Sequence, residues 1–194
     1  MNQSLASFFA NHASFTSKEA KRAGISPSQI AYYIKKGEIE RVSRGVYRSL
    51  KVESSIPTPW EELVITANSI PQGVICLISA LQIYELTDEF AHEHWVAVPF
   101  TSWPAKREHT RIIRMRNLTL GKTKMPMGDV NITIFDRERT IIDCFRLISK
   151  EVALKALKRY LKGAGEYKPD FKKLNTYAKK LHFEITPYIE AMTT

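Results

Sequence analysis

Two helix-start signals follow one another near the N-terminus, and they constrain the fold of this chain more than any other feature. In a capping box, a hydroxyl side chain and a Glu or Gln three residues later satisfy the first free N–H groups of a helix. The sequence has two such boxes, Thr16 with Glu19 and Ser26 with Gln29. Between them, Gly24 favours the left-handed conformation that ends a helix. We therefore predict one helix over residues 17–23 and a second from Pro27 to about Lys36.

The spacing between these two helices is typical of a helix-turn-helix. Two helices that cross closely need a small residue on the first, Gly in the turn and an aliphatic residue on the second. The residues that meet this need are Ala20, Gly24 and Ile30. A short amphipathic helix from Leu5 precedes them, and two β-prone segments, 39–42 and 46–48, follow around a Ser-Arg-Gly turn. The predicted structure of residues 1–52 is a winged helix-turn-helix.

One face of the second helix carries polar and basic side chains that suit DNA. At about 100° per residue, Ile30, Tyr33 and Ile34 form an apolar arc, and the opposite arc is polar. Its groups can hydrogen-bond base edges and phosphates. The predicted DNA contacts are Lys18 and Arg22 on the first helix, Ser28, Gln29, Tyr32, Lys35 and Lys36 on the second, and Arg44 at the hairpin tip. Two alternatives stay open, a merely solvated face and a winged helix that docks onto protein.

Basic charge lies in two separate blocks of the sequence. Residues 1–51 hold nine Lys or Arg and three Asp or Glu, a net charge of +6. Residues 53–104 hold seven acidic residues and no Lys or Arg, whereas residues 105–194 hold twenty basic and ten acidic residues. Two basic blocks favour a polyanionic partner, of which nucleic acid is the usual one. Solubility alone is the simpler alternative.

The charge changes sign at a Ser/Pro-rich stretch, SSIPTP, where helices cannot continue. We place a domain boundary there, between a winged-helix DNA-binding domain over 1–52 and a second domain over 60–194. In the second domain the predicted helices span 60–70, 78–86, 138–149, 152–162 and 170–181, and the predicted strands span 73–77, 94–100, 110–117 and 130–136. The expected fold class is therefore α/β (α+β), a winged helix followed by a mixed α/β domain with a helical C-terminal tail.

A second basic surface is predicted within the second domain. Its members are Arg111 and Arg114 around one strand, and Lys155, Lys158, Arg159 and Lys162 at helical spacing opposite three leucines. Each group is equally well explained as a solvated face. Together they suggest contact with flanking DNA or with an RNA. An RNA-binding or nucleic-acid-processing protein that uses this domain is the alternative function.

Three acidic residues, Asp136, Glu138 and Asp143, cluster at the end of a predicted strand, as they would in a metal-dependent nuclease or nucleotidyltransferase. The simpler explanation is that Asp136 caps the following helix while Glu138 favours its positive end. No lysine on the adjoining strand and no Gly-Ser nucleotide loop supports an enzyme. His92 and His94 lack a third ligand for a metal. We therefore expect no catalysis, no metal and no cofactor.

Several features bear on the compartment. No apolar run approaches the ~20 residues of a membrane span, and the N-terminus lacks the basic region and cleavage site of a signal peptide. Cys76 and Cys144 lie in apolar segments without metal-ligand spacing. Buried free thiols are expected, because cytosolic disulfides are rare. These features predict a cytoplasmic protein without a membrane partner.

Three segments, in one order along the chain, are similar to a single family. The first is FTSKEAKRAGISPSQIAYYIKKGEIERVSRGVYR, and the second is GVICLISALQIYELTDEFAHEHWVAVP. The third, TIFDRERTIIDCFRLISK, carries Asp136, Arg139, Thr140, Asp143, Cys144 and Phe145 at the positions of a D-x-x-R-T-[ILV]-x-D-[CA]-[FL] pattern. Together they resemble the AbiEi-type antitoxins of type IV (abortive infection) toxin–antitoxin systems. The resemblance extends over about residues 5–185.

The resemblance implies a transcriptional repressor that binds inverted repeats upstream of its own operon through the winged helix. It also implies an antitoxin that counters a nucleotidyltransferase-like toxin without a stable complex, and that needs its C-terminal domain for this. Ser28, Gln29, Tyr32, Lys35 and Lys36 match the reading helix of the family, and Arg44 matches its wing. Asp136, Arg139 and Asp143 are expected to be structural, with Arg139 tying the helix start to a carboxylate. Because one winged helix makes few base contacts, two copies should bind together, as a dimer or cooperatively on DNA.

Overall fold

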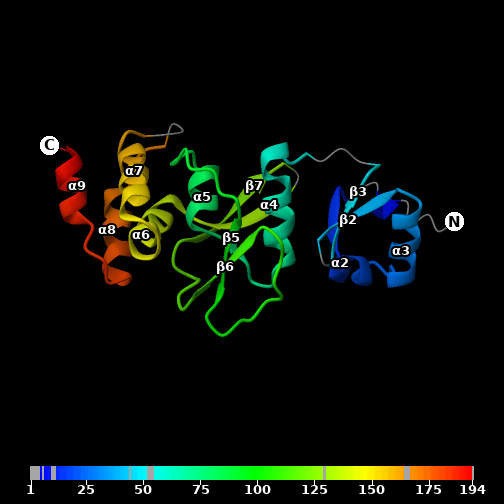
Figure 1. The fold of residues 1–194 in the computed structure, drawn as a ribbon. Helices are drawn as coiled ribbons and strands as arrows, with labels where there is room; N and C mark the ends of the chain where they lie inside the picture. The colour runs from blue at the N-terminus through cyan, green and yellow to red at the C-terminus, as the bar shows by residue number, and fades with distance from the viewer. Residues whose placement is uncertain are drawn as a thin grey trace. The chain divides into compact units, whose positions relative to one another are not determined.

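A computed structural model describes residues 5, 7–9, 12–43, 45–51, 55–128, 130–163 and 167–193 (Figure 1). The chain divides into two compact units. The first comprises Met1–Pro71, Pro104–Glu108 and Met125–Ile132, and the second comprises Gln72–Trp103, His109–Lys124 and Thr133–Thr194. The boundary that we place between residues 52 and 60 stays a prediction.

The first unit contains the winged helix-turn-helix (Figure 1). Helices α2 (Ser17–Arg22) and α3 (Pro27–Lys35) are followed by a hairpin of β2 (Ile39–Ser43) and β3 (Val46–Ser49). A further strand, β1 (Ser14–Thr16), pairs antiparallel with β3, which gives the sheet order β1-β3-β2. The sequence did not predict β1, because three residues carry no alternating pattern of their own and depend on their partner strand.

A small apolar core holds the winged helix together. Its buried members are Leu5, Phe9, Phe15, Ala20, Ile25, Ile30 and Ile39. Ala20 on α2 and Ile30 on α3 meet in this core, and Gly24 between the helices has the left-handed φ of +76°. The predicted helix-turn-helix spacing is thus confirmed. Ile34 is an exception in the predicted apolar arc, because its side chain is exposed.

Helix α4 (Thr58–Ser69) also belongs to the first unit and packs against β1 and β3. Arg48 on β3 reaches it, since its Nη1 donates to Glu61 Oε2 at 3.0 Å. Arg107 donates from Nε to Ser69 Oγ at 3.1 Å and from Nη2 to the Ser69 carbonyl at 3.2 Å, which satisfies the last turn of α4. Both arginines are therefore used within the fold.

A five-stranded mixed sheet follows, in the order β6-β5-β4-β8-β7. Its strands are β4 (Val74–Ile75), β5 (His94–Pro99), β6 (Thr110–Met115), β7 (Lys122–Met127) and β8 (Val130–Phe135). β6 is an edge strand and runs parallel to β5, with Trp95 opposite Arg111 and Val98 opposite Arg114. The sequence did not predict β7, because Pro126 and a run of exposed polar residues hide the pattern of this opposite edge strand.

The helices of the second unit are α5 (Leu77–Ile83), α6 (Arg137–Leu147), α7 (Lys150–Leu161), α8 (Phe171–Lys180) and α9 (Thr186–Thr193). Helix α6 is buried over residues 138–144 and contacts α5, α7 and α8, so the helix after β8 is the centre of this unit (Figure 1). The predicted strand over 73–77 is shorter, because Leu77 already begins α5. Helix α9 was not predicted as a separate element.

Cys76 and Cys144 are free and buried, as predicted. Burial raises the pKa of both thiols well above its ordinary value, so neither is a reactive thiolate. The mixed α and β fold class is confirmed. Among the described helices, none combines the length and the apolar character that crossing a membrane requires.

Candidate nucleic-acid interface

Two capping boxes fix the starts of α2 and α3. Thr16 Oγ1 accepts the N–H of Glu19 at 3.2 Å, and Glu19 Oε2 accepts the N–H of Thr16 at 2.7 Å. The second box is alike, because Ser26 Oγ accepts the Gln29 N–H at 3.3 Å and Gln29 Oε1 accepts the Ser26 N–H at 2.8 Å. Both predicted boxes are confirmed. They define which residues of α3 face outward.

The outer face of α3 exposes an aromatic ring and two lysines. Tyr32, Lys35 and Lys36 are all exposed. The Lys36 ammonium lies 5.2 Å from the centre of the Tyr32 ring and 3.7 Å from a carboxylate oxygen of Glu38. The hydrogen bond to Tyr32, together with the charges of Tyr32 and Glu38, raises the pKa of Lys36. Lys36 is therefore a cation that lies beside an aromatic ring. Lys35, by contrast, makes no ion pair with any described residue.

Ser28 and Gln29, the predicted DNA contacts nearest the start of α3, are partly engaged within the protein. Gln29 uses its amide oxygen in the capping box, so only Nε2 is left to donate outward. Ser28 Oγ lies 2.9 Å from Ser26 Oγ. Bidentate recognition of adenine needs both groups of a Gln amide. In this conformation Gln29 can therefore offer a ligand the N–H donors of Nε2 but not its amide oxygen as an acceptor.

Basic side chains on α2 are also exposed. Lys18, Lys21 and Arg22 face solvent, and none of the three makes an ion pair with a described residue. Lys18 lies in the first turn of α2, where the helix dipole disfavours a positive charge. A cation without a partner at such a position suits an anionic ligand.

The wing is tied to the start of α2. The N–H of Ser17 donates to the Gly45 carbonyl at 2.8 Å, and Gly45 has a left-handed φ of +78°. The hairpin turn is therefore held next to the helix-turn-helix. Arg44, the predicted contact at the hairpin tip, lies outside the described residues, so its placement stays a prediction.

Half of the basic stripe on α7 is paired within the protein. Arg159 forms an ion pair with Asp88, and Lys155 Nζ lies 2.7 Å from a carboxylate oxygen of Glu151. The remaining cations of the stripe are Lys158 and Lys162. Both are exposed, and neither makes an ion pair with a described residue. The stripe therefore offers less free positive charge than its sequence indicates.

Arginines on the edge strand β6 stack on aromatic rings. The guanidinium carbon of Arg111 lies 4.4 Å from the centre of the Trp95 ring. That of Arg114 lies 3.8 Å from the centre of the Trp103 ring and 5.8 Å from that of Phe100. Both arginines were predicted from the sequence, whereas their aromatic neighbours were not. Phe100 and Trp103 are large apolar residues close to polar ones in the loop after β5, and this pattern could have indicated the aromatic surface.

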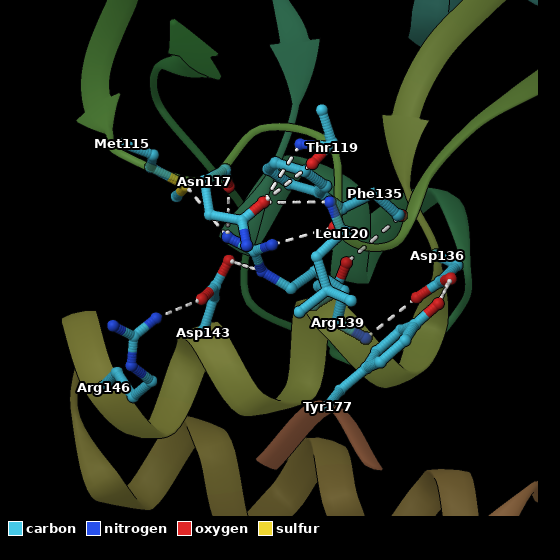
Figure 2. Close-up of polar contacts among 11 residues, drawn as sticks. Met115, Asn117, Thr119, Leu120, Phe135, Asp136, Arg139, Asp143, Arg146 and Tyr177 are labelled. Carbon is cyan, nitrogen blue, oxygen red and sulfur yellow. Dashed lines mark hydrogen bonds and ion pairs between the residues drawn. The ribbon is translucent and has the colours of Figure 1, made fainter. Parts of the chain in front are cut away.

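Arg139 at the start of α6 is buried and satisfied on every side, as Figure 2 shows. Its Nε donates to Asp143 Oδ2 at 2.6 Å, and Nη1 and Nη2 donate to the carbonyls of Leu120 and Asn117 at 2.8 and 2.9 Å. Asp136 Oδ1 accepts the backbone N–H of Arg139 at 2.9 Å and caps the helix. The predicted tie between Arg139 and a carboxylate is confirmed, and it also fixes the connection after β6.

A second polar network surrounds Glu138, whose side chain is fully buried. Tyr160 donates to Glu138 Oε1 at 2.8 Å, Tyr167 donates to the same oxygen, and Lys173 Nζ lies 3.0 Å from Oε2. Lys173 also lies 3.1 Å from Asp136 Oδ2. Burial alone would raise the pKa of Glu138, but the hydrogen bonds from Tyr167, Lys173 and Tyr160 outweigh it and lower that pKa. The carboxylates are thus engaged with internal partners.

The network includes a lysine whose contact with these acids was not predicted from the sequence. Lys173 comes from α8, far along the chain from Asp136 and Glu138, so no local spacing reveals the contact. Across the described residues, no group of three or more His, Cys, Asp or Glu is placed to hold a metal ion.

Comparisons with known proteins bear on the winged helix. Residues 3–49 match the family described as "Transcriptional regulator, AbiEi antitoxin". No match was found among curated proteins. The family match covers the helix-turn-helix and its wing, and the resemblance of residues 50–194 stays a prediction. Over these residues, the winged helix of this chain is similar to the AbiEi antitoxin family of transcriptional regulators.

Proposed function

We propose that this protein is a DNA-binding repressor of its own operon, and that the outer face of α3 contacts the operator. The observation that carries the proposal is the exposed row of Tyr32, Lys35 and Lys36 beside the unpaired cations of α2. A helix with such a face fits the major groove, where polar side chains meet base edges and cations meet phosphates. The family of the winged helix supports a regulatory role.

The two helices divide the contacts between them. Lys18 and Arg22 on α2 bind backbone phosphates, which positions the domain without selecting a sequence. On α3, Tyr32 and the free Nε2 of Gln29 face the bases. Lys35 and Lys36 neutralise phosphates, and Arg44 on the wing reaches a phosphate or a minor groove. Sequence preference therefore resides mainly in α3.

Two copies of the protein bind one operator. A single helix of nine residues reaches few base pairs, so one winged helix gives little specificity. An inverted repeat presents the same half-site twice, and two copies bound together combine their contacts. The pair forms either before binding or cooperatively on DNA.

The proposed antitoxin role rests on the family of the winged helix. We propose that the protein counters a nucleotidyltransferase-like toxin in the type IV manner, without a stable complex, inside the cytoplasm. The second unit supplies this activity. The internal pairing of Glu138 and Asp143 supports a role without catalysis, because neither carboxylate is free to act on a substrate.

The operator proposal is tested with the DNA upstream of the protein's own gene. Mobility shift with the intact inverted repeat is compared with a fragment in which one half-site is scrambled. We expect scrambling to weaken binding by more than tenfold, because several base pairs are lost at once. Equal affinity for the intact and scrambled fragments would refute operator recognition by paired winged helices.

The antitoxin proposal needs a separate test. The full chain is co-expressed with the proposed nucleotidyltransferase-like toxin, and growth is measured. We expect rescue by the wild-type chain and by its Lys35→Ala/Lys36→Ala variant alike, because neutralisation does not pass through the operator. Pull-down should recover no toxin. Failure of the wild-type chain to rescue growth contradicts the antitoxin role and leaves the repressor proposal intact.

A further inference from the structure

Two arginines and two aromatic rings form a small platform at the end of the edge strand β6. Arg114 lies between the rings of Phe100 and Trp103, at 5.8 and 3.8 Å from their centres. The guanidinium of Arg116 lies 5.4 Å from the centre of the Phe100 ring. We call Phe100, Trp103, Arg114 and Arg116 the Arg–aromatic platform. All four residues belong to the second unit.

Backbone hydrogen bonds hold the platform in place. The N–H of Phe100 donates to the Met115 carbonyl at 3.0 Å, which extends the pairing of β5 with β6 by one residue. The N–H of Ser102 donates to the Pro99 carbonyl at 2.8 Å and closes the turn that carries Trp103. The rings are thus anchored beside the arginines by the sheet itself, and the surface is preformed.

The platform is exposed although its rings are large and apolar. Phe100 is 51% exposed and Trp103 is 80% exposed. Arg114 covers one face of the Trp103 indole, so the opposite face is open to solvent. Trp is among the residues that bury most apolar area when a protein folds. A tryptophan as exposed as Trp103 is therefore uncommon unless it binds a ligand or partner.

The arginines of the platform have no acidic partner among the described residues. Arg114 and Arg116 make no ion pair with any described residue, in contrast to Arg159 with Asp88 or Arg111, which lies 3.9 Å from Glu93. Residues 109–124 contain five Lys or Arg and no Asp or Glu. A ligand for this surface therefore carries negative charge and presents flat rings.

We propose that the Arg–aromatic platform binds single-stranded nucleic acid. A base stacks on the open face of Trp103, and the phosphates next to it accept hydrogen bonds from Arg114 and Arg116. Arginine suits both tasks, because its plane stacks on an aromatic ring while its N–H groups point outward to phosphate. This site is distinct from the outer face of α3 in its elements and its ligand.

Single strands fit this surface better than duplexes do. In a duplex each base is already stacked on its neighbours, so its flat face is closed to Trp103 unless the base leaves the helix at a cost of a few kcal/mol. A single strand offers its base faces freely. Stacking and phosphate contacts do not involve the 2′-hydroxyl, so RNA and DNA strands of the same sequence bind alike.

Fluorescence anisotropy on the full chain tests the proposal. The labelled probes are oligouridylate and oligothymidylate of about 12 nucleotides, within the size range of such sites, and a mixed-sequence duplex of equal length. In the Lys35→Ala/Lys36→Ala variant, which removes two of the proposed duplex contacts of α3, we expect both single strands to bind more tightly than the duplex. Trp103→Ala should weaken their binding by about tenfold or more. Arg114→Lys should weaken it less, because it keeps the charge and loses the stacking plane.

Phe90→Ala is the matched control, since Phe90 is an aromatic residue of the same unit that is 87% exposed and outside the platform. Its affinity should equal that of the wild-type chain. The Lys35→Ala/Lys36→Ala variant should also bind single strands normally, which separates this site from the operator site. The proposal is overturned if neither single strand binds, if Trp103→Ala binds single strands as Phe90→Ala does, or if the Lys35→Ala/Lys36→Ala variant binds the duplex as tightly as the single strands.

Discussion

Several cations on the surface of the winged helix make no ion pair with a described residue, whereas several charged side chains of the second unit are buried and paired with one another. Lys18, Arg22 and Lys35 face solvent without an ion pair to any described residue. In the second unit, by contrast, Arg139 is enclosed by Asp143 and two backbone carbonyls. Charged residues therefore have different roles in the two units. In the first case the charge is available to a ligand, and in the second it holds helices and loops together.

This difference leads to opposite expectations for substitutions. Removing a surface cation from the winged helix leaves stability nearly unchanged, because exposed substitutions usually stay within about 0.5 kcal/mol. Removing one member of a buried pair leaves the other charge without a partner and costs much more. Binding assays should respond to the first kind of change and unfolding assays to the second.

The largest effect is expected for Arg139→Met, which leaves Asp143 buried without its main partner. We expect the free energy of unfolding to fall by about 3–5 kcal/mol, measured by urea denaturation. Arg146→Met is the matched control, because Arg146 pairs with the same carboxylate at 2.8 Å but is partly exposed. Similar losses in the two variants would contradict a structural role specific to the buried arginine.

A smaller effect is expected for Glu138→Gln, and it depends on pH. The pKa of Glu138 is lowered from its ordinary value of 4.5, so the folded state holds this proton less tightly than the unfolded state does. Its ionisation therefore stabilises the fold above about pH 4.5, and that contribution disappears as pH falls through the lowered pKa. We expect Glu138→Gln to cost about 1–3 kcal/mol at pH 7 and much less at pH 3.

The control for this pH dependence is Glu151→Gln, which removes an exposed carboxylate paired with Lys155. Solvent screens that pair, so its loss should change stability little at either pH. The free energy of unfolding of the wild-type chain and of Glu138→Gln is measured at pH 7 and at pH 3. If both lose the same amount, Glu138 contributes nothing to acid sensitivity.

The smallest change in stability is expected for Gln29→Glu in the winged helix. A Glu at this position keeps the capping box with Ser26 but removes the Nε2 donor and adds a negative charge. We expect the ratio of operator affinity to random-DNA affinity to fall while urea denaturation stays unchanged. A variant that keeps the wild-type ratio would remove Gln29 from the set of base contacts.

The winged helix could be predicted closely because its signals are local. Each capping box lies within four residues, and Gly24 marks the turn by its own conformational freedom. β1 and β7 were missed. Local chemistry thus revealed the helices, whereas β1 depends on its distant partner β3, and Pro126 and exposed polar residues hide the pattern of β7.

The candidate sites show the same limit. Helical periodicity correctly placed Tyr32, Lys35 and Lys36 on an exposed face. It also indicated a free basic stripe on α7, where contact with Asp88 pairs Arg159. Which cations are free depends on acidic residues distant in sequence, and such contacts leave no trace in a helical pattern.

Operator binding across a range of salt concentrations tests the central claim most directly. Lys35→Ala/Lys36→Ala is compared with Lys179→Ala/Lys180→Ala, which removes two adjacent exposed lysines from α8 instead. The account predicts weaker binding for the first variant, and a slope of log affinity against log salt that is shallower by about 0.9 for each lost phosphate contact. The second variant should behave as the wild-type chain. Unchanged affinity and slope in Lys35→Ala/Lys36→Ala would contradict the assignment of α3 as the helix that binds DNA.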